Sequence, residues 1–566
     1  MGMAVVKLVG ALFKAPLKTV VGEYGMGLFN VAYNFYGPVH SLATAGLPIA
    51  ISRIVSESYS MGRFRDIRKI KKVSTPIFLF LGIAGTLLMI LGAPYYCKEL
   101  IRNQQAMLPM LALAPAVLFG CLGSIYRGYY EGLKNMYPTA VSEIIEASSK
   151  LIVGLSASVA VMLRFKEEYD KSGTLLGQRV ASPDEAALMT LSFAAAAAIV
   201  GVTVGSLLSF LFLFFRYHKG GDGIDERLIA AAPKARSGKL LAKILIRTAV
   251  PVAIGSVTVN IAGLIDTTFL QQRLSKIMLT EPKVLMSMYQ GLIPEMYLRQ
   301  PETIPNFLFG CYSMALTVYM LVPTVTQAFS ISALPSVTRL WAEGNKKKLK
   351  DGIEMVLKMT ALFSLPAGIG ISAIAPQITT LLYGSDISSP VVSGILVLLG
   401  IAAAFAALST PISSMLQAIG RADIPVKLLA AAMVIKIGIN YLLCGTAEIN
   451  VYGAAVGTLV CYLVLVIAEL IWLCRAAGVR ISAAVFVKPL ISAILCGIAA
   501  YMTAQLTGRL VTADGRGAAL IITSAAIAAG AAVYCISLWA TGAVSRKDLD
   551  LFPKGQKIVK ILEKHR

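Results

Sequence analysis

Charge, histidine and paired cysteines are scarce in this sequence. Of its 566 residues only 14% are charged and three are histidines, whereas 57% are hydrophobic. The eight cysteines show no C-x-x-C spacing, which argues against a zinc site or a redox motif. There is no GxxxxGK[ST] phosphate-binding loop and no polar region large enough for a soluble nucleotide-binding domain. We therefore expect no enzyme: the sequence predicts no catalytic residues, no metal site and no cofactor.

Long apolar segments dominate what remains. They run for about 18 to 30 residues with Gly and Pro scattered through them, as in membrane helices, and the mean hydropathy of the chain is +0.73. The short alternating strands of an outer-membrane barrel are absent. We predict an all-α polytopic membrane protein with about fourteen transmembrane helices. The expected helices are 4–22, 26–56, 74–96, 107–131, 137–163, 185–217, 243–271, 306–341, 355–383, 387–418, 424–447, 450–475, 482–506 and 515–541.

Positive charge concentrates in alternate loops. The net charge is +22, and basic residues gather in 63–72, 219–239 and 346–350 and in the tail from 546 to 566. By the positive-inside rule these loops face the cytoplasm, which places both termini of a multi-pass plasma-membrane protein inside the cell. Because topology accounts for the charge, we expect membrane lipids and no nucleic acid as partners.

Two basic motifs recur at a constant spacing, which indicates duplication. The recurring residues are Tyr33, Arg53, Glu57, Lys134, Pro138 and Lys150, matched about 286 positions later by Tyr319, Arg339, Glu343, Arg421, Pro425 and Lys436. Six helices return the chain to its starting side, so the repeats form two six-helix bundles inserted in the same sense. The expected regions are an N-terminal lobe (1–217), a cytoplasmic linker (218–242), a C-terminal lobe (243–475), two extra transmembrane helices (476–541) and a basic cytoplasmic tail (542–566).

The first apolar segment carries three lysines on one face. Lys7, Lys14 and Lys18 fall within roughly 40° of one another on a helix wheel. A lysine near the centre of a membrane helix costs roughly 2.5 to 3.5 kcal/mol, so the stripe should face protein or water. We interpret it as one wall of a cationic cavity for an anionic solute. The alternative is an amphipathic helix on the membrane surface with snorkelling lysines.

Three other basic residues are candidates for the same site. Arg53 would capture an anion or pair with Glu57 across one helical turn. Lys150 and Lys436 lie about twelve residues into their helices, roughly 18 Å deep, where snorkelling is difficult. Glu146, one turn before Lys150, offers that lysine an internal ion pair, so a neutralised pair and a substrate contact both remain open.

Ion coupling has three candidate residues. His40 lies in the middle of the second helix and would sense protons or pack as a neutral side chain. Asp266 is the acid well inside the seventh helix, where it would bind a coupling ion, cap a helix or form an ion pair. Glu146 is the third, because it lies near the level of Lys150.

Three runs resemble a known family: GLPIAISRIVSE at 46–57, YRGYYEGLKNMYPTAVSEIIE at 126–146 and LQAIGRADIPVKLLAAAMVIKIGINYLL from residue 416. They are similar to the stage V sporulation protein B and polysaccharide-exporter branch of the multidrug/oligosaccharidyl-lipid/polysaccharide superfamily, which includes Gram-positive lipid II flippases. The resemblance implies fourteen helices in two lobes and export of a polyprenyl-diphosphate-linked sugar precursor by alternating access.

Individual residues match the family pattern in part. The lipid II flippases carry two basic residues flanking a glycine in their first helix, and Lys7, Gly10 and Lys14 resemble that arrangement. Ala15 stands where those flippases often have an aspartate, and the neutral SMAL at 313–316 stands where they place an arginine. The segment 272–305 is an additional stretch whose role the sequence does not indicate.

These observations predict a transporter that flips a lipid II-like cell-wall or polysaccharide precursor to the outer leaflet. The anionic substrate would bind at Lys7, Lys14, Lys18, Arg53, Lys150 and Lys436. One alternative is a multidrug cation antiporter of the same fold, which would need acidic residues in its cleft. Another is a scaffold that moves nothing and recruits envelope-synthesis enzymes or spore-cortex factors.

Overall fold

The computed structural model describes residues 2–221, 223–511 and 515–543, and their side chains except those of 2–12, 259 and 332. Thirteen segments in these ranges are long and apolar enough to cross a membrane. The chain is therefore an all-α multi-pass membrane protein, as predicted. Within the described ranges, strands are limited to a two-residue antiparallel pair, β1 (Thr174–Leu175) and β2 (Gln178–Arg179).

The chain divides into two compact units. Unit 1 comprises 1–313 with 444–451, and unit 2 comprises 314–443 with 452–566. The boundary falls inside helix α11 (Ile304–Tyr319), whereas the sequence predicted it in the linker 218–242. The reason lies in helix α8 (Gly238–Thr280), which packs against the first helices of the chain and so belongs to unit 1.

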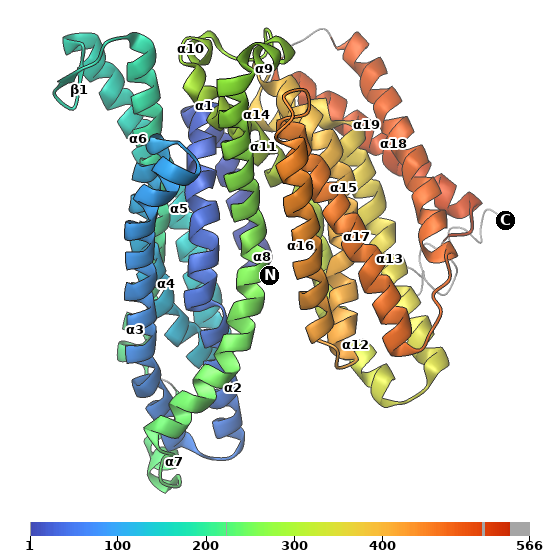
Figure 1. Ribbon diagram of the computed structural model, residues 1–566. Coiled ribbons are helices and arrows are strands. Elements are labelled where there is room, and N and C mark those ends of the chain that lie inside the picture. The colour runs from blue at the N-terminus through green and yellow to red at the C-terminus, as the bar shows by residue number, and fades with distance from the viewer. Residues whose placement is uncertain (1, 222, 512–514, 544–566) are drawn as a thin grey trace. The chain divides into compact units, whose positions relative to one another are not determined.

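Unit 1 is a bundle of long helices with short connecting elements (Figure 1). Its elements before α8 are α1 (Gly2–Thr44), α2 (Gly46–Ser60), α3 (Phe64–Tyr95), η1 (Tyr96–Leu100), η2 (Gln104–Ala106), α4 (Met107–Gly132), α5 (Tyr137–Ser172), α6 (Pro183–Gly220) and α7 (Glu226–Ala231). After α8 follow α9 (Pro282–Met288), α10 (Glu295–Leu298) and η3 (Pro301–Thr303). Within this unit, α7 lies at one end of the bundle and β1 at the other (Figure 1).

Unit 2 is also helical. Its elements after α11 are α12 (Leu321–Ala342), α13 (Lys346–Ala373), α14 (Ala375–Tyr383), α15 (Ser389–Ala418), α16 (Asp423–Leu443), α17 (Val451–Ala477), α18 (Ala484–Leu510) and α19 (Arg516–Ala540). Its apolar core is formed by α12, α13, α15 and α17 together with the start of α18. The last two helices, α18 and α19, pack on each other, and α18 packs on α13.

The N-terminal region contains two helical arms, close to the predicted pair of helices at 4–22 and 26–56. Helix α1 continues through this stretch with a break at Gly22, whose backbone adopts φ 61° and ψ −171°. A side chain at this left-handed position would be strained, so glycine permits the sharp turn. The break divides α1 into two arms, and the second arm leads directly into α2. The thirteen apolar segments of the described ranges count 13–60 as one, whereas the prediction of fourteen helices counts the two arms separately.

Helices α5 and α6 extend past the predicted ends at 163 and 185. Helix α5 has 36 residues, about 54 Å of helix, against a hydrocarbon thickness of about 30 Å. The protruding hairpin has an apolar cluster of its own, made by Phe165, Leu175 and Ala186 with partly buried neighbours. Gly173 ends α5 in a left-handed conformation, φ 65°, as a C-terminal cap.

The segment 218–242 packs against the start of α3. Asp66, fully buried, accepts hydrogen bonds from the backbone N–H of Arg236 at 2.7 Å and from its Nε at 2.6 Å. The same guanidinium reaches Glu57 at 3.5 Å and donates to Ser58 at 3.1 Å. This network attaches the beginning of α8 to α2 and α3.

The segment 272–305 extends α8 and then forms α9, α10 and η3. Tyr297 stacks on Tyr24 with ring centroids 5.9 Å apart and packs against Phe307 at 5.0 Å. The Tyr289 hydroxyl donates a hydrogen bond to Asn450. The segment therefore supports α1 just beyond its break at Gly22.

Candidate functional site

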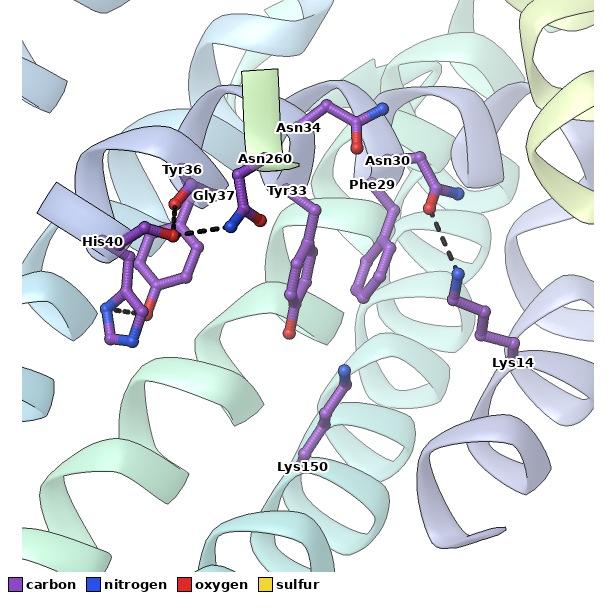
Figure 2. A pocket seen from close by; sticks show the side chains of 11 residues that line it. Lys14, Phe29, Asn30, Tyr33, Asn34, Tyr36, Gly37, His40, Lys150 and Asn260 are labelled. Carbon is purple, nitrogen blue, oxygen red and sulfur yellow. Dashed lines mark hydrogen bonds between the residues drawn. The ribbon is translucent and has the colours of Figure 1, made fainter. Parts of the chain in front are cut away.

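A pocket of about 380 Å³ lies inside unit 1, between α1, α5 and α8 (Figure 2). Most of its lining comes from the second arm of α1. The lining residues are Lys14, Phe29, Asn30, Tyr33, Asn34, Tyr36, Gly37, His40, Ser41, Lys150 and Asn260.

Helical periodicity places the polar residues of α1 on the pocket side. Asn30, Asn34, Gly37 and Ser41 recur at intervals of three or four residues, so they share one face of the helix. Tyr33, Tyr36 and His40 recur at the same spacing. They form an adjacent stripe on the helix that also lines the pocket. A polar face inside a membrane helix requires protein or water beside it, which the pocket provides.

Two glycines allow α1 and α8 to approach with asparagines between them. A Cβ atom at Gly37 would lie 3.1 Å from Asn260 Oδ1, and one at Gly263 would lie 3.0 Å from Asn34 Oδ1. Asn260 Nδ2 donates to the Ser41 hydroxyl at 2.7 Å. Asn34 Nδ2 donates to the hydroxyl of Thr267 at 2.6 Å. These bonds orient both amides across the helix interface.

Lys14 reaches the pocket from the first arm of α1. Its Nζ donates a hydrogen bond to Asn30 Oδ1 at 3.3 Å, and Asn30 Nδ2 donates in turn to the carbonyl of Met26 at 2.8 Å. The second bond holds the amide with its oxygen towards the lysine (Figure 2). Lys14 is thus positioned on the pocket wall as predicted for a cationic site.

Lys150 enters the pocket from α5 and lies among aromatic rings. Its Nζ is 4.6 Å from the ring centroid of Tyr33, 5.2 Å from that of Phe13 and 5.7 Å from that of Phe29. Ring faces attract a cation by about 0.5 to 2 kcal/mol each, according to how far the pair is removed from water. The rings hold the ammonium group without neutralising its charge.

The pocket is therefore electropositive. Two of its described lining residues are lysines and none is acidic. Two ammonium groups facing one small space repel each other, and an anion placed between them would relieve that repulsion. Asparagine amides and tyrosine hydroxyls provide additional neutral donors around it.

The other lysines of the predicted stripe do not join this pocket. Lys18 is 4% exposed and lies 3.2 Å from Glu23, so the pair spans the break at Gly22. An ammonium group held by a carboxylate offers less charge to a substrate. Lys7 is in α1, but its side chain lies outside the residues whose side chains are described.

Arg53 and Lys436 are also outside the pocket. Arg53 is exposed on α2, and Glu57, the alternative partner for Arg53, pairs with Arg236. Lys436 belongs to α16 in unit 2 and is 3% exposed. Of the six predicted anion-binding residues, the described pocket contains Lys14 and Lys150.

Of the two alternatives open for Lys150, the ion pair with Glu146 is not formed among the described residues. Glu146 Oε2 instead accepts Arg127 Nη2 of α4 at 2.8 Å, and its other oxygen accepts the hydroxyl of Ser206 at 3.3 Å. Arg127 also donates to Ser209 at 2.8 Å. The arginine takes the carboxylate away from Lys150 and leaves that lysine to the pocket.

The two remaining coupling candidates have neutral hydrogen-bond partners. His40 lines the pocket, with Nδ1 2.8 Å from the Tyr36 hydroxyl and the two rings stacked at 4.7 Å. Asp266 of α8 is 3% exposed and accepts the Tyr312 hydroxyl at 3.0 Å. Their roles in ion coupling stay predictions.

Sequence reasoning missed most of the polar lining. Asn30, Asn34 and Asn260 were not selected, although an asparagine in an apolar membrane segment needs a polar partner. The spacing of the polar residues along α1 was the available signal. The sequence places Arg127 in the family-like run at 126–146 but does not identify it as the partner of Glu146. That pairing depends on the packing of α4 against α5.

Comparisons with known proteins agree with this architecture. The polysaccharide biosynthesis protein family matches residues 1–164, and the MatE family matches residues 309–442. The chain is 25% identical over 550 residues to "Lipid II flippase MurJ" of Bacillus subtilis (strain 168), which covers 94% of this chain and 92% of that protein. It is 22% identical over 560 residues to "Stage V sporulation protein B" of the same organism, covering 97% and 95%.

A solved structure has the same fold. The structure of "Lipid II flippase MurJ" in an inward closed conformation aligns with a TM-score of 0.61 and 14% identity, covering 95% of this chain and 96% of that one. At this identity the similarity shows the fold. The relatives span nearly the whole chain, including both units.

Proposed function

We propose that the chain is a transporter of the multidrug/oligosaccharidyl-lipid/polysaccharide superfamily and that it flips a polyprenyl-diphosphate-linked cell-wall or polysaccharide precursor, lipid II-like, to the outer leaflet. The proposed mechanism is alternating access. No covalent step is needed, and both termini would lie in the cytoplasm with the basic loops. Enzymes that make or use such precursors at the envelope, in growth or in spore formation, are the proposed partners.

The observation that carries this proposal is the charge of the pocket. Lys14 and Lys150 face the same space and no acidic residue is among its described lining. A diphosphate brings at least two negative charges into a medium where isolated ions cost many kcal/mol, and fixed cations offset that cost. Lysine suits this task because its ammonium group acts as a point charge on phosphate without demanding bidentate geometry.

The size of the pocket limits which part of the substrate it would hold. Its volume of about 380 Å³ is near the lower end for ligand pockets, about 300 to 1,000 Å³. This is space for a diphosphate and the sugar ring next to it, not for a whole oligosaccharide head group. The ring faces of Tyr33 and Tyr36 and the amides of Asn34 and Asn260 would border such a sugar ring.

The membrane potential offers a driving force. With the inside negative, outward movement of an anion gains roughly 2.3 kcal/mol per charge for every 100 mV. An empty cationic pocket is drawn back towards the cytoplasmic side. Flipping should therefore slow when the potential is collapsed with an ionophore, and an unchanged rate would remove this part of the proposal.

The pocket favours this function over a multidrug cation antiporter. A site for organic cations needs acidic or aromatic side chains and no nearby positive charge. The two lysines of this pocket would repel a cation. A non-transporting scaffold makes a different prediction, because it would tolerate neutral residues at Lys14 and Lys150.

Reconstitution into proteoliposomes tests the proposal. We would follow the movement of a labelled polyprenyl-diphosphate sugar between leaflets by its accessibility to an external reagent. Lys14→Ala should lower the flipping rate about 10- to 100-fold, the expected effect of losing one charge-assisted interaction. The control is Lys171→Ala, because this lysine is an exposed residue of α5, paired with Glu167 outside the pocket.

The outcomes separate the alternatives. Loss of flipping in Lys14→Ala with normal insertion and a normal rate in Lys171→Ala supports the proposed site. A fully active Lys14→Ala protein contradicts the site. A wild-type protein that moves organic cations and not the lipid-linked sugar contradicts the proposed substrate.

A further inference from the structure

Unit 2 contains a buried carboxylate that the proposed transport site does not use. Glu469 of α17 is 1% exposed. The Ser409 hydroxyl donates to its Oε2 at 2.8 Å, and the Ser413 hydroxyl donates to its Oε1 at 2.6 Å. Both serines belong to α15 and lie one helical turn apart. Each carboxylate oxygen therefore has one hydroxyl donor from the facing helix.

The orientation of these two serines differs from that of neighbouring hydroxyls on the same helix. Thr410 donates to the carbonyl of Ala406 at 3.2 Å, and Ser414 donates to that of Thr410 at 3.3 Å. Such bonding to the preceding turn is usual for hydroxyls in membrane helices. Ser409 and Ser413 instead form a small polar site with Glu469 between two otherwise apolar helix faces.

No cation neutralises this carboxylate in the described part of unit 2. Helix α15 carries no charged side chain. Charged residues occur on the other helices of the unit, among them Arg339 (α12), Lys358 (α13), Lys436 (α16), Arg475 (α17) and Lys488 (α18). Within the described residues none of these forms an ion pair with Glu469, whose partners are the two serines.

The repeat shows how unusual this is. In unit 1 the partly exposed Glu146 is paired with Arg127 of α4 at 2.8 Å. The position about 286 residues after Arg127 is Ser413. Unit 2 thus has a hydroxyl at the place where unit 1 has a guanidinium. Glu469 lies on a different helix of its repeat from Glu146, and its partners in the described residues are hydroxyl groups in place of an arginine.

A proton is the simplest neutralising cation. An ionised carboxylate removed from water is costly unless it is paired, and hydrogen bonds from two neutral hydroxyls compensate for only part of that cost. A metal ion would need a fuller shell of oxygen ligands, and the described residues contain no group of three or more His, Cys, Asp or Glu that could hold one. A protonated carboxyl group can donate to one serine and accept from the other.

We propose that Glu469, Ser409 and Ser413 form a proton-binding site of unit 2. The carboxyl group carries a proton while α15 and α17 are packed together. It releases that proton to water when the two helices separate enough to admit water, and takes one up again when they close. Proton exchange at this site would then accompany the conformational cycle of unit 2.

Infrared difference spectroscopy on the full chain in lipid nanodiscs tests the protonation directly. Near neutral pH, the wild type should show the carbonyl stretch of a protonated carboxyl group that is lost in Glu469→Gln. Ser413→Ala should keep this band and shift its frequency, because one hydrogen bond is removed. The matched control Glu448→Gln alters an exposed glutamate and should leave the band unchanged.

Proton movement is the functional measurement. Proteoliposomes containing a pH-sensitive dye should report proton flux coupled to transport, and this flux should fall at least tenfold in Glu469→Gln and remain in Glu448→Gln. The proposal is overturned if the wild type shows only the carboxylate band near neutral pH, if the band responds to sodium and not to pH, or if proton flux survives in Glu469→Gln. The spectroscopic result does not depend on the transported substrate, so its failure leaves the proposed flippase function in place.

Discussion

The two repeats keep the same basic motifs but surround them with different residues. Lys150 and Lys436 occupy equivalent places, and both are in membrane helices. The polar face of α1 is only partly repeated: Asn30, Asn34 and Tyr36 correspond, about 286 positions later, to the apolar residues Leu316, Met320 and Val322. Duplication therefore preserved the helical scaffold, whereas the polar pocket is a property of unit 1.

The two units also surround their membrane-helix carboxylates differently. Unit 1 neutralises Glu146 with Arg127, and unit 2 surrounds Glu469 with two serines. An arginine pair is fixed, because guanidinium keeps its charge at all physiological pH values. A carboxyl group among hydroxyls can change its charge by exchanging a proton. Our two proposals accordingly place anion binding in unit 1 and proton binding in unit 2.

The largest effect is expected where unit 1 is most tightly packed. A Cβ atom at Gly310 would lie 1.9 Å from the backbone oxygen of Glu23, whereas one at Gly370 in unit 2 would meet nothing within 4 Å. Gly310→Ala should lower the free energy of unfolding by about 3 kcal/mol or more, since the obstacle is backbone. Gly370→Ala should be neutral or stabilising by up to about 1 kcal/mol.

Thermal or denaturant unfolding in detergent would measure this pair of variants. If Gly310→Ala is as stable as Gly370→Ala, the close approach of α1 and α11 in unit 1 is not required for its packing.

A second difference concerns the equivalent lysines. Lys150→Ala should reduce flipping about 10- to 100-fold, because it removes a charge from the pocket. Lys436→Ala should have a smaller effect, since Lys436 does not line that pocket. Initial flipping rates in proteoliposomes compare the two. Equal losses would show that anion binding is shared between the units, and Lys150→Arg should retain part of the activity.

The carboxylates provide a third, smaller test. Arg127→Ala leaves Glu146 without its cation and should lower the free energy of unfolding by about 1 to 2 kcal/mol, allowing for the partial exposure of both side chains. Glu469→Gln should change it by less than about 1 kcal/mol, because the serines can still bond to the amide. Denaturation midpoints of the two variants compare these effects. If Glu469 were ionised and structurally essential, Glu469→Gln would have the lower midpoint of the two.

The smallest effect concerns the segment 272–305 of unit 1. Tyr297→Leu keeps an apolar side chain and loses the stacking on Tyr24 and the tilted ring contact with Phe307, at a cost of about 1 kcal/mol. Unfolding measurements would detect this loss. A much larger loss would show that the segment holds the break at Gly22 in place, and no loss would show that the stacking is incidental.

Much of the architecture could be predicted from the sequence. The apolar segments, the helical class and the repeat followed from local pattern, because a chain in lipid must satisfy its backbone hydrogen bonds within each helix. Lys14 and Lys150 were selected for the same reason: charge at that depth needs an aqueous or polar neighbour. Helix α5 continues to its C-terminal cap at Gly173, beyond its predicted end at 163, whereas the break at Gly22 falls where the first helix was predicted to end.

Only the tertiary structure decided which charges remain available. Lys18 and Lys14 lie one turn apart on the same helix, yet the first is paired with Glu23 and the second faces the pocket. Glu146 lies one turn from Lys150 but pairs with Arg127 on another helix. Hydropathy and periodicity depend on neighbours along the chain, so the sequence determined them by itself. Partner choice depends on distances between helices, and these exist only once the helices have packed.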